Sequence, residues 1–223
     1  MEIINNQMYA VLTGDLIKSS KYSLEEKQAA FQTLRESTVL LKKIVPDMET
    51  LGIESFRGDS WQLLISHPQF ALNTAFLFRS ALKMKALPDT RIAIGVGAVT
   101  HIPNNQLAEA SGSAFELSGK GLDSLKKNMI FKIDMDHVNF MEQIEAILNA
   151  SVQLASRLTD QWSQNEARAV YGAIQGMKQV DIGQLWIKPI RQQSVQDALY
   201  RAGWAEIDTL CSGFKTYMDK VIK

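Results

Sequence analysis

Apolar and polar positions along the first two-thirds of the chain follow two periods, which predict alternating strands and helices. Residues 8–13 form an apolar run rich in strand formers and predict a buried strand. Over 23–44 the apolar positions recur at helical spacing, on a face that comprises Leu24, Phe31, Leu34, Leu41 and Ile44. Ser23 and Glu26 have the spacing of a capping box, and Pro46 ends the helix.

Two short strands follow, over 51–57 and 61–66, with Gly58 in the tight turn between them, where a positive φ is needed. The next elements are a helix over 68–87, a strand over 91–99, a helix over 113–125 and a short strand over 129–133. The two glycines of strand 91–99 indicate that something packs or binds close to its backbone. The order is β-α-β-β-α-β-α-β, and without its last strand it matches the split β-α-β ferredoxin-like arrangement.

After Asp134 the strand signals end and only helical spacing remains. A long amphipathic helix is predicted over 136–158, and its apolar side is marked by Met141, Ile144, Ile147, Leu148 and Leu154. Shorter helices are expected over 165–175, 180–186, 191–202 and 206–222. The pattern therefore predicts an α+β protein with three parts: a ferredoxin-like α/β sandwich over 1–135, a helical connector over 136–160 and a small all-α domain over 161–223.

Composition and charge limit the classes of function that the chain can have. The 223 residues carry 24 basic and 24 acidic side chains, which argues against a basic coat for non-specific nucleic-acid binding. Residues 1–145 hold 15 basic and 17 acidic side chains and residues 146–223 hold 9 and 7, so only the second part has the sign of a nucleic-acid-facing tail. A single cysteine, Cys211, and the lack of a long apolar run predict a cytoplasmic protein with no membrane partner.

Two Gly-Asp pairs mark the candidate chemistry. Asp15 is expected just past the end of the first strand, and Asp59 at the tip of the hairpin. Because these strands are neighbours in a β-α-β-β-α-β sheet, the two carboxylates can converge near one edge. Paired carboxylates are how proteins hold Mg²⁺ or Mn²⁺ beside substrate phosphates. The alternative is that each Gly-Asp pair is only a turn.

Residues around the two aspartates are candidates for binding a nucleotide or another phosphate ligand. Gly14 and Gly58, each directly before an aspartate, let the backbone come close. Ser19, Ser20 and nearby backbone N–H groups can meet phosphate oxygens. Arg57 is the neighbouring cation, and its alternative role is to keep the hairpin edge in water.

Four motifs together resemble a known family. They are VLTGDLIKSS at 11–20, RGDSWQLLI at 57–65, RIAIGVG at 91–97 and GSAFELSGKGL at 112–122. In this order they resemble the SatD family, which is similar to the class III nucleotidyl cyclase and GGDEF catalytic domains. The resemblance covers most of residues 8–135 and implies a nucleotidyl cyclase-type sandwich. It also implies that Asp15 and Asp59 hold two metal ions, assisted by the backbone carbonyl near Leu16.

The helix over 113–125 departs from the cyclase pattern. Active class III cyclases carry there an Asn and, four residues later, an Arg, which steady the ribose and the transferring phosphoryl charge. This chain has Glu116 and Lys120 at those places. A carboxylate disfavours an anionic substrate, and Lys lacks the planar fork of Arg. The pair is alternatively a surface i,i+4 ion pair. Binding is therefore expected over turnover, with Lys120 as the catalytic candidate if the chain is an enzyme.

The C-terminal pattern resembles a helix-turn-helix, and SatD-like chains end in a comparable unit. Gly183 lets two helices cross closely, and Ile182, Val195 and Leu199 are expected to form their shared core. The side chains that can reach phosphates and base edges are Lys188, Arg191, Gln192, Gln193, Ser194 and Gln196. Basic side chains are few, and a homodimer would double the phosphate contacts. The alternative is a small helical domain for dimerisation or protein contacts.

These features predict a regulatory protein, in which a cyclase-like domain senses a nucleotide or phosphate ligand and a helix-turn-helix binds DNA. The alternative is a metal-dependent nucleotidyl or phosphoryl transferase that uses Asp15 and Asp59, with Lys120 stabilising the transition state. A third interpretation is a structural dimer whose Gly-Asp pairs are turns.

Overall fold

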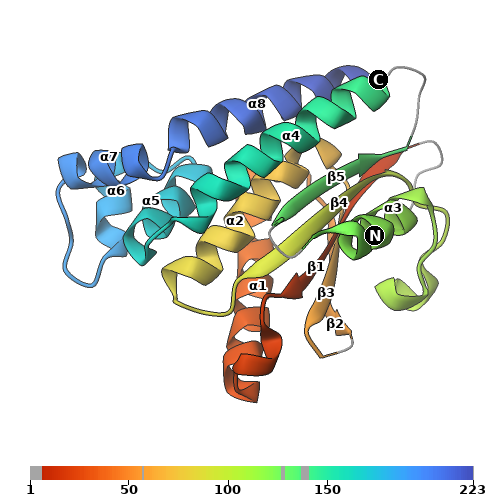
Figure 1. The fold of residues 1–223 in the computed structure, drawn as a ribbon, viewed down its shortest axis with the longest axis horizontal. Coiled ribbons are helices and arrows are strands. Elements are labelled where there is room, and N and C mark those ends of the chain that lie inside the picture. Colours follow the sequence, from red (N-terminus) through yellow and green to blue (C-terminus); the bar gives the residue numbers. More distant parts are fainter. Residues whose placement is uncertain (1–6, 57, 127–128, 137–140, 223) are drawn as a thin grey trace.

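The computed structural model describes residues 7–56, 58–126, 129–136 and 141–222 and has a mixed α+β fold (Figure 1). The strands are β1 (Met8–Leu16), β2 (Thr50–Phe56), β3 (Ser60–Ile65), β4 (Thr90–Ala98) and β5 (Phe131–Met135). The helices are α1 (Leu24–Ile44), α2 (Ala71–Met84), α3 (Ser113–Ser124), α4 (Met141–Asp160), α5 (Gln164–Ile174), α6 (Gln179–Ile182), α7 (Gln192–Arg201) and α8 (Trp204–Val221). The predicted α+β class and the order β-α-β-β-α-β-α-β are confirmed.

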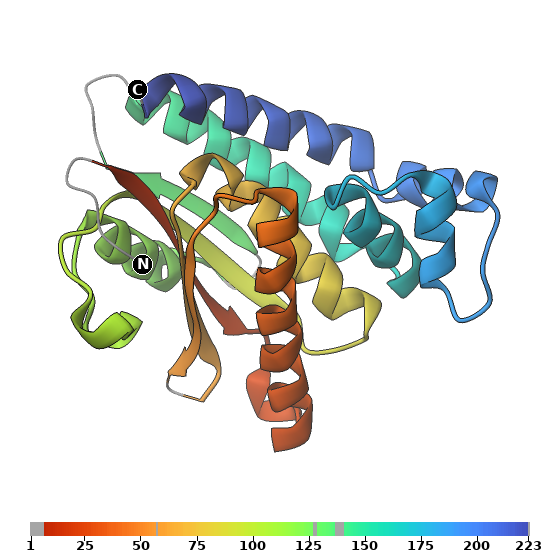
Figure 2. The same ribbon diagram turned by 180° about the vertical axis from the view of Figure 1, so that it is seen from behind.

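The five strands form one sheet in the order β2-β3-β1-β4-β5. Neighbours are antiparallel except β4 and β5, which are parallel. Helices α1 and α2 cover one face of the sheet and α3 covers the other, as the two opposite views show (Figures 1 and 2). Because strand residues alternate between faces, the sheet has two cores, a large one under α1 and α2 and a smaller one under α3.

Local signals decide where α1 begins. Ser23 accepts a hydrogen bond from the Glu26 backbone N–H, and the Glu26 side chain accepts one from the Ser23 N–H, so the predicted capping box is present. Phe31 and Leu34 are buried as expected. The inclusion of Leu24 in the buried face was wrong: it lies in the first turn and is 69% exposed.

Helix α4 turns inward only part of the predicted apolar side: Leu148 packs against the large core, whereas Ile144, Ile147 and Leu154 do not. The side chain of Met141 lies outside the described residues. Ile147 is 62% and Leu154 is 72% exposed. The buried side chains are Val152, Ala155, Ser156 and Thr159. The exposed residues Ile144, Ile147, Leu154 and Leu158 form a stripe along the helix, which we call the α4 stripe. Polar contacts account for this orientation, because the inward side of α4 lies against the outer edge of β5.

Three side chains of α4 bond the backbone of β5, and we call this set of bonds the edge ladder. Asn149 Nδ2 donates to the Ile133 carbonyl at 2.6 Å, and its Oδ1 accepts from the Ile133 N–H at 3.0 Å. Glu145 Oε2 accepts from the Met135 N–H at 2.9 Å, and Gln153 Nε2 donates to the Phe131 carbonyl at 2.5 Å. The spacing of four residues on the helix matches every second residue of the strand, so four outer backbone groups of β5 are bonded without a further strand.

The C-terminal helices continue the large core. Helix α5 packs against α2, and α8 lies beside α4 (Figures 1 and 2). Phe214 and Met218 of α8 are fully buried and belong to the same apolar cluster as the sheet residues under α1 and α2. Within the described part of the chain, no helix has both the length and the hydropathy needed to cross a bilayer.

Candidate functional site

Asp15 lies inside β1 and not past its end, because the strand continues to Leu16. In the sheet register Asp15 stands opposite Ser60 of β3 and Arg91 of β4. The turn alternative is wrong for Gly14, which is a strand residue. A Cβ at Gly14 would lie 2.4 Å from the Trp61 ring and 2.6 Å from the Arg91 carbonyl, so glycine is needed there to seat a buried tryptophan.

Arg91 is the site residue that the sequence pattern did not single out. Its Nε donates to Asp15 Oδ1 at 2.9 Å, and its second terminal nitrogen pairs with Asp15 Oδ2. The remaining terminal nitrogen donates to the Leu125 carbonyl at 3.3 Å. The bond to Asp15 raises the pKa of Arg91, burial opposes this, and the charges of Asp15 and Asp59 add to the rise. Both oxygens of Asp15 are therefore held by one planar guanidinium.

Asp15 and Asp59 were expected to converge near one edge of the sheet, and Asp15 pairs in register with Ser60, the residue that directly follows Asp59. Ser19 Oγ donates to Asp59 Oδ2 at 2.6 Å, and the Leu16 N–H donates to the Asp59 carbonyl at 2.9 Å. Gly58 has a φ of 83°, so the turn interpretation is right for this pair. Ser20 is exposed beside Ser19. Arg57 lies outside the described residues.

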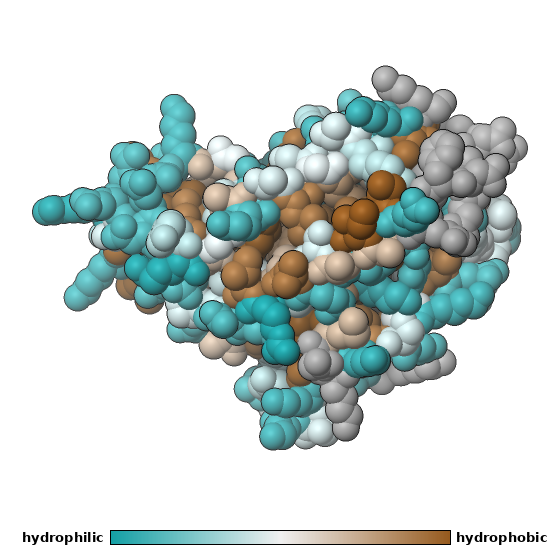
Figure 3. Space-filling model, turned by 45° about the horizontal axis from the view of Figure 1, so that its top comes forward, coloured by the Kyte–Doolittle hydropathy of each residue, from teal (hydrophilic) through white to brown (hydrophobic). Residues whose placement is uncertain are grey.

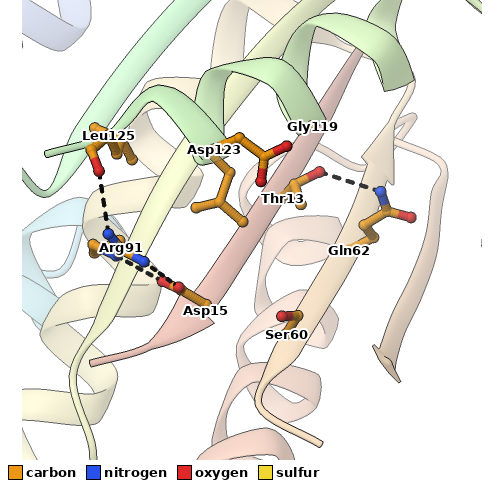
Figure 4. Close-up of a pocket in the computed structure, with 9 residues that line it drawn as sticks. Thr13, Asp15, Ser60, Gln62, Arg91, Gly119, Asp123 and Leu125 are labelled. Carbon is orange, nitrogen blue, oxygen red and sulfur yellow. Dashed lines mark hydrogen bonds and ion pairs between the residues drawn. The ribbon is translucent and has the colours of Figure 1, made fainter. Parts of the chain in front are cut away.

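A polar cavity of about 440 Å³ opens beside Asp15, between the sheet and the end of α3 (Figure 4). We call it the Asp15 pocket; its walls comprise Thr13, Asp15, Ser60, Gln62, Arg91, Gly119, Leu122, Asp123 and Leu125. Gln62 Nε2 donates to Thr13 Oγ1 at 3.3 Å, and Thr13 Oγ1 donates to Ser118 Oγ at 2.8 Å. The pocket thus offers amide, hydroxyl, carboxylate and guanidinium groups on rigid elements.

Lys120 and Glu116 point away from this pocket. They form an i,i+4 ion pair at 3.3 Å on the outer side of α3, with 76% and 69% of the side chains exposed. Neither residue lines the Asp15 pocket. The surface-pair alternative therefore describes their geometry.

A divalent metal at Asp15 would have to displace Arg91. Both Asp15 oxygens bond that guanidinium, and Asp59 accepts from Ser19. Within the described residues, no group of three or more His, Cys, Asp or Glu side chains is placed to hold a metal ion. Arg91 and Ser19 thus already bond the oxygens of the two aspartates that were expected to hold Mg²⁺ or Mn²⁺, and the metal site stays a prediction.

The candidate DNA-reading residues lie in the loop before α7 and in the first turns of that helix. Lys188, Arg191, Gln192, Gln193, Ser194 and Gln196 are all exposed. Ile182, Val195 and Leu199 are buried, as predicted for the shared core. The predicted helix over 180–186 is shorter than expected, because α6 has one turn and continues as a 3-10 turn over Gly183–Leu185.

Gly183 is needed for the loop before α7 and not for a crossing of two helices. A Cβ there would lie 2.4 Å from the Ile190 carbonyl, whereas the Val195 side chain would be 3.7 Å away. The same loop is fixed by Trp186, whose Nε1 donates to Asn165 Oδ1 at 2.9 Å. The Arg168 guanidinium lies over the Trp186 ring, 5.2 Å from its centre. These contacts hold α7 in a set orientation on α5.

Comparison of the chain with protein-family models, with curated proteins and with solved structures finds no match. The resemblance to the SatD family therefore stays a prediction from four motifs. Function is inferred below from the Asp15 pocket and from the exposed face of α7.

Proposed function

We propose that this chain is a regulatory protein. Its α+β part, a ferredoxin-like sandwich of the nucleotidyl cyclase type, senses a nucleotide or related phosphate ligand, and its C-terminal helices bind DNA as a helix-turn-helix. The order β2-β3-β1-β4 supports the ferredoxin-like assignment. The observation that carries the proposal is the ion pair of Arg91 with both oxygens of Asp15 in the wall of a polar pocket.

This ion pair favours binding over turnover. It occupies the carboxylate that a metal-dependent transferase would use, and Lys120 lies outside the pocket. Thr13, Ser60 and Gln62 remain as uncharged hydrogen-bonding groups on the sheet. Such groups recognise the hydroxyls and ring nitrogens of a nucleoside. A requirement for Mg²⁺ or Mn²⁺ stays a prediction that the following measurement includes.

Nucleotides are expected to stabilise the chain in a thermal-shift measurement. ATP, GTP or a cyclic dinucleotide at about 100 times its dissociation constant adds about 2.7 kcal/mol, which raises the melting temperature by roughly 5–10 °C for a chain of this size. Asp15→Asn and Gln62→Leu are expected to abolish the shift, with and without Mg²⁺ or Mn²⁺. Lys85→Met is the control, since it breaks the exposed pair with Glu36 at 3.1 Å, outside the pocket.

An unchanged melting temperature with every nucleotide would refute the sensing role. A shift that persists in both pocket variants would also refute it, because the ligand would then bind elsewhere. Conversion of the nucleotide into a cyclic or linear product would instead support the transferase alternative.

A homodimer is the oligomeric state that we propose, and the α4 stripe supports it. In Figure 3, whose view brings α4 and α8 forward, brown apolar surface lies along the middle of the face. In the α4 stripe, Leu154, Ile147 and Leu158 have exposed fractions of 72%, 62% and 37%. A twofold axis across this helix would place Ile147 against Leu154 of a second copy, as an isologous contact requires.

DNA binding is expected to depend on the start of α7. In an electrophoretic shift with a pool of random duplexes at low salt, Arg191→Ala is expected to weaken binding and to lower the salt slope by about one per chain. Arg201→Ala is the matched control, because Arg201 lies at the other end of α7 and already pairs with Glu166 at 3.2 Å. The mass of the complex is expected to correspond to two chains per duplex. Absence of any shift at low salt would contradict a DNA role and would favour protein contacts.

A further inference from the structure

A second polar cavity, of about 360 Å³, lies away from the Asp15 pocket and shares no lining residue with it. We call it the Arg79 pocket. Its walls come from the β1–α1 segment, the second half of α2, the turn before β4 and the end of α4. The cavity therefore lies where the sheet meets the helix that leads into α5–α8.

Cations outnumber carboxylates in the walls of the Arg79 pocket. Lys18, Arg79, Lys83 and Arg157 face only Asp89 and Asp160, four charges against two, for a formal net charge of +2. A small ligand with two negative charges would balance this set.

Arg79 forms hydrogen bonds with both of these carboxylates. Its Nε and one terminal nitrogen donate to the two oxygens of Asp89 at 3.0 and 2.8 Å, and the same terminal nitrogen donates to Asp160 Oδ1 at 2.6 Å. The other terminal nitrogen bonds Thr159. Only 1% of the Arg79 side chain is exposed, so this network is a fixed floor of the cavity.

The other three cations, Lys18, Lys83 and Arg157, have fewer negatively charged partners than Arg79 has. Lys83 Nζ donates to the Asp160 carbonyl at 3.2 Å and stands 3.8 Å from Asp89 Oδ2. Within the described residues, the side chains of Lys18 and Arg157 have no hydrogen-bond or ion-pair partner, and they line the cavity. Burial lowers the pKa of Lys83, and the charge of Arg79 lowers it further, while Asp89 and Asp160 offset this only in part. The negative charges of Asp89 and Asp160 beside Lys83 therefore do not fully compensate for its burial and for the nearby charge of Arg79.

The rest of the lining limits the ligand to a small organic or inorganic anion. Ile17 and Ile130 supply apolar walls, and Tyr22 supplies a phenol. A volume of about 360 Å³ is at the lower end for small-molecule sites. A phosphate group accepts charge-assisted hydrogen bonds from Lys and Arg together, and an ester substituent of a few atoms suits the isoleucine walls.

We propose that the Arg79 pocket binds a dianionic phosphate, either inorganic phosphate or a small phosphate monoester, through Lys18, Lys83 and Arg157. The site is separate from the nucleotide pocket proposed above. Its occupant contacts both the sheet side and the end of α4, so binding strengthens the attachment of the C-terminal helices.

Isothermal titration of the full chain, in a phosphate-free buffer with KCl at fixed ionic strength, tests the proposal. Inorganic phosphate and glycerol phosphate are the two probes, and saturable binding of either one is expected. Lys83→Met together with Arg157→Met is expected to weaken it at least tenfold, because each cation donates a charged hydrogen bond. Stronger binding of the ester would identify the monoester as the occupant, and stronger binding of inorganic phosphate would identify the free ion.

Lys85→Met, near the end of α2 but outside the cavity, is the matched control and is expected to bind as the unaltered chain does. Gln62→Leu is also expected to bind normally, which separates this site from the Asp15 pocket. Each of the two methionine substitutions removes a cation that the Arg79 network does not need, and the melting temperature of the variant without phosphate confirms folding. Lack of saturable binding of both probes, or full binding in the folded double variant, would overturn the proposal.

Discussion

Gly95→Val is expected to lower the free energy of unfolding by about 3 kcal/mol and to abolish ligand binding in the Asp15 pocket. A Cβ at Gly95 would lie 2.2 Å from the Ala114 carbonyl and 2.5 Å from the Ser118 N–H. Both are backbone groups of α3, so the helix itself must move away from β4. That movement breaks the buried bond between Thr13 and Ser118 and displaces one wall of the pocket. Urea denaturation gives the stability, and the thermal shift with nucleotide gives the binding.

The matched control is a glycine whose Cβ would meet nothing. Gly213 lies in α8 with no atom within 4 Å of the added position. Gly213→Ala is expected to raise the stability by about 0.5–1 kcal/mol, because alanine favours the helix. If Gly95→Val unfolds at the same urea concentration as the unaltered chain, the close packing of α3 on β4 is refuted.

Arg79→Met is expected to destabilise the chain by about 3–5 kcal/mol, since it leaves Asp89 and Asp160 without their buried cation. The guanidinium joins three elements: α2, the turn before β4 and the end of α4. It also lies 5.8 Å from the centre of the Phe131 ring, which adds a cation–π contact. Equilibrium unfolding in urea measures the loss.

An exposed ion pair near the same helix provides the comparison. Lys85 and Glu36 are 42% and 53% exposed, so Lys85→Met is expected to cost at most about 1 kcal/mol. Equal losses from the two substitutions would mean that Arg79 contributes no more than a surface charge, which contradicts the structural role assigned to it.

The order of strands and helices was predictable because each signal is local. Apolar runs and helical spacing are read within one segment, and the capping box of Ser23 and Glu26 is complete within four residues. The turn at Gly58 also needs only its own neighbours. The sequence predicted that Asp15 and Asp59 lie near one edge of the sheet, and this expectation follows from the same order of elements, because that order places the hairpin beside β1. The hydrogen bond between Ser19 and Asp59 was not predicted.

Features that depend on register or on polar matching were not predictable. Arg91 lies at the start of a strand, where a cation is common and indicates no particular role. Only the pairing of β1 with β4 shows that it stands opposite Asp15. The rotation of α4 was predicted wrongly because hydropathy favoured Ile147 and Leu154 as the inner side. The hydrogen bonds that Asn149 and Gln153 make to β5 outweigh that preference.

The edge ladder also has a consequence for self-association. A bare outer strand is a template on which another chain can add its own strand, and this is a common route to aggregation. In this chain α4 already bonds the Phe131 carbonyl, both outer groups of Ile133 and the Met135 N–H. Helix α4 is the next element after β5 in the chain, and its side chains cover the outer edge of that strand. Strand addition is thereby hindered at β5, and the proposed contact with a second copy would use the outer face of the same helix.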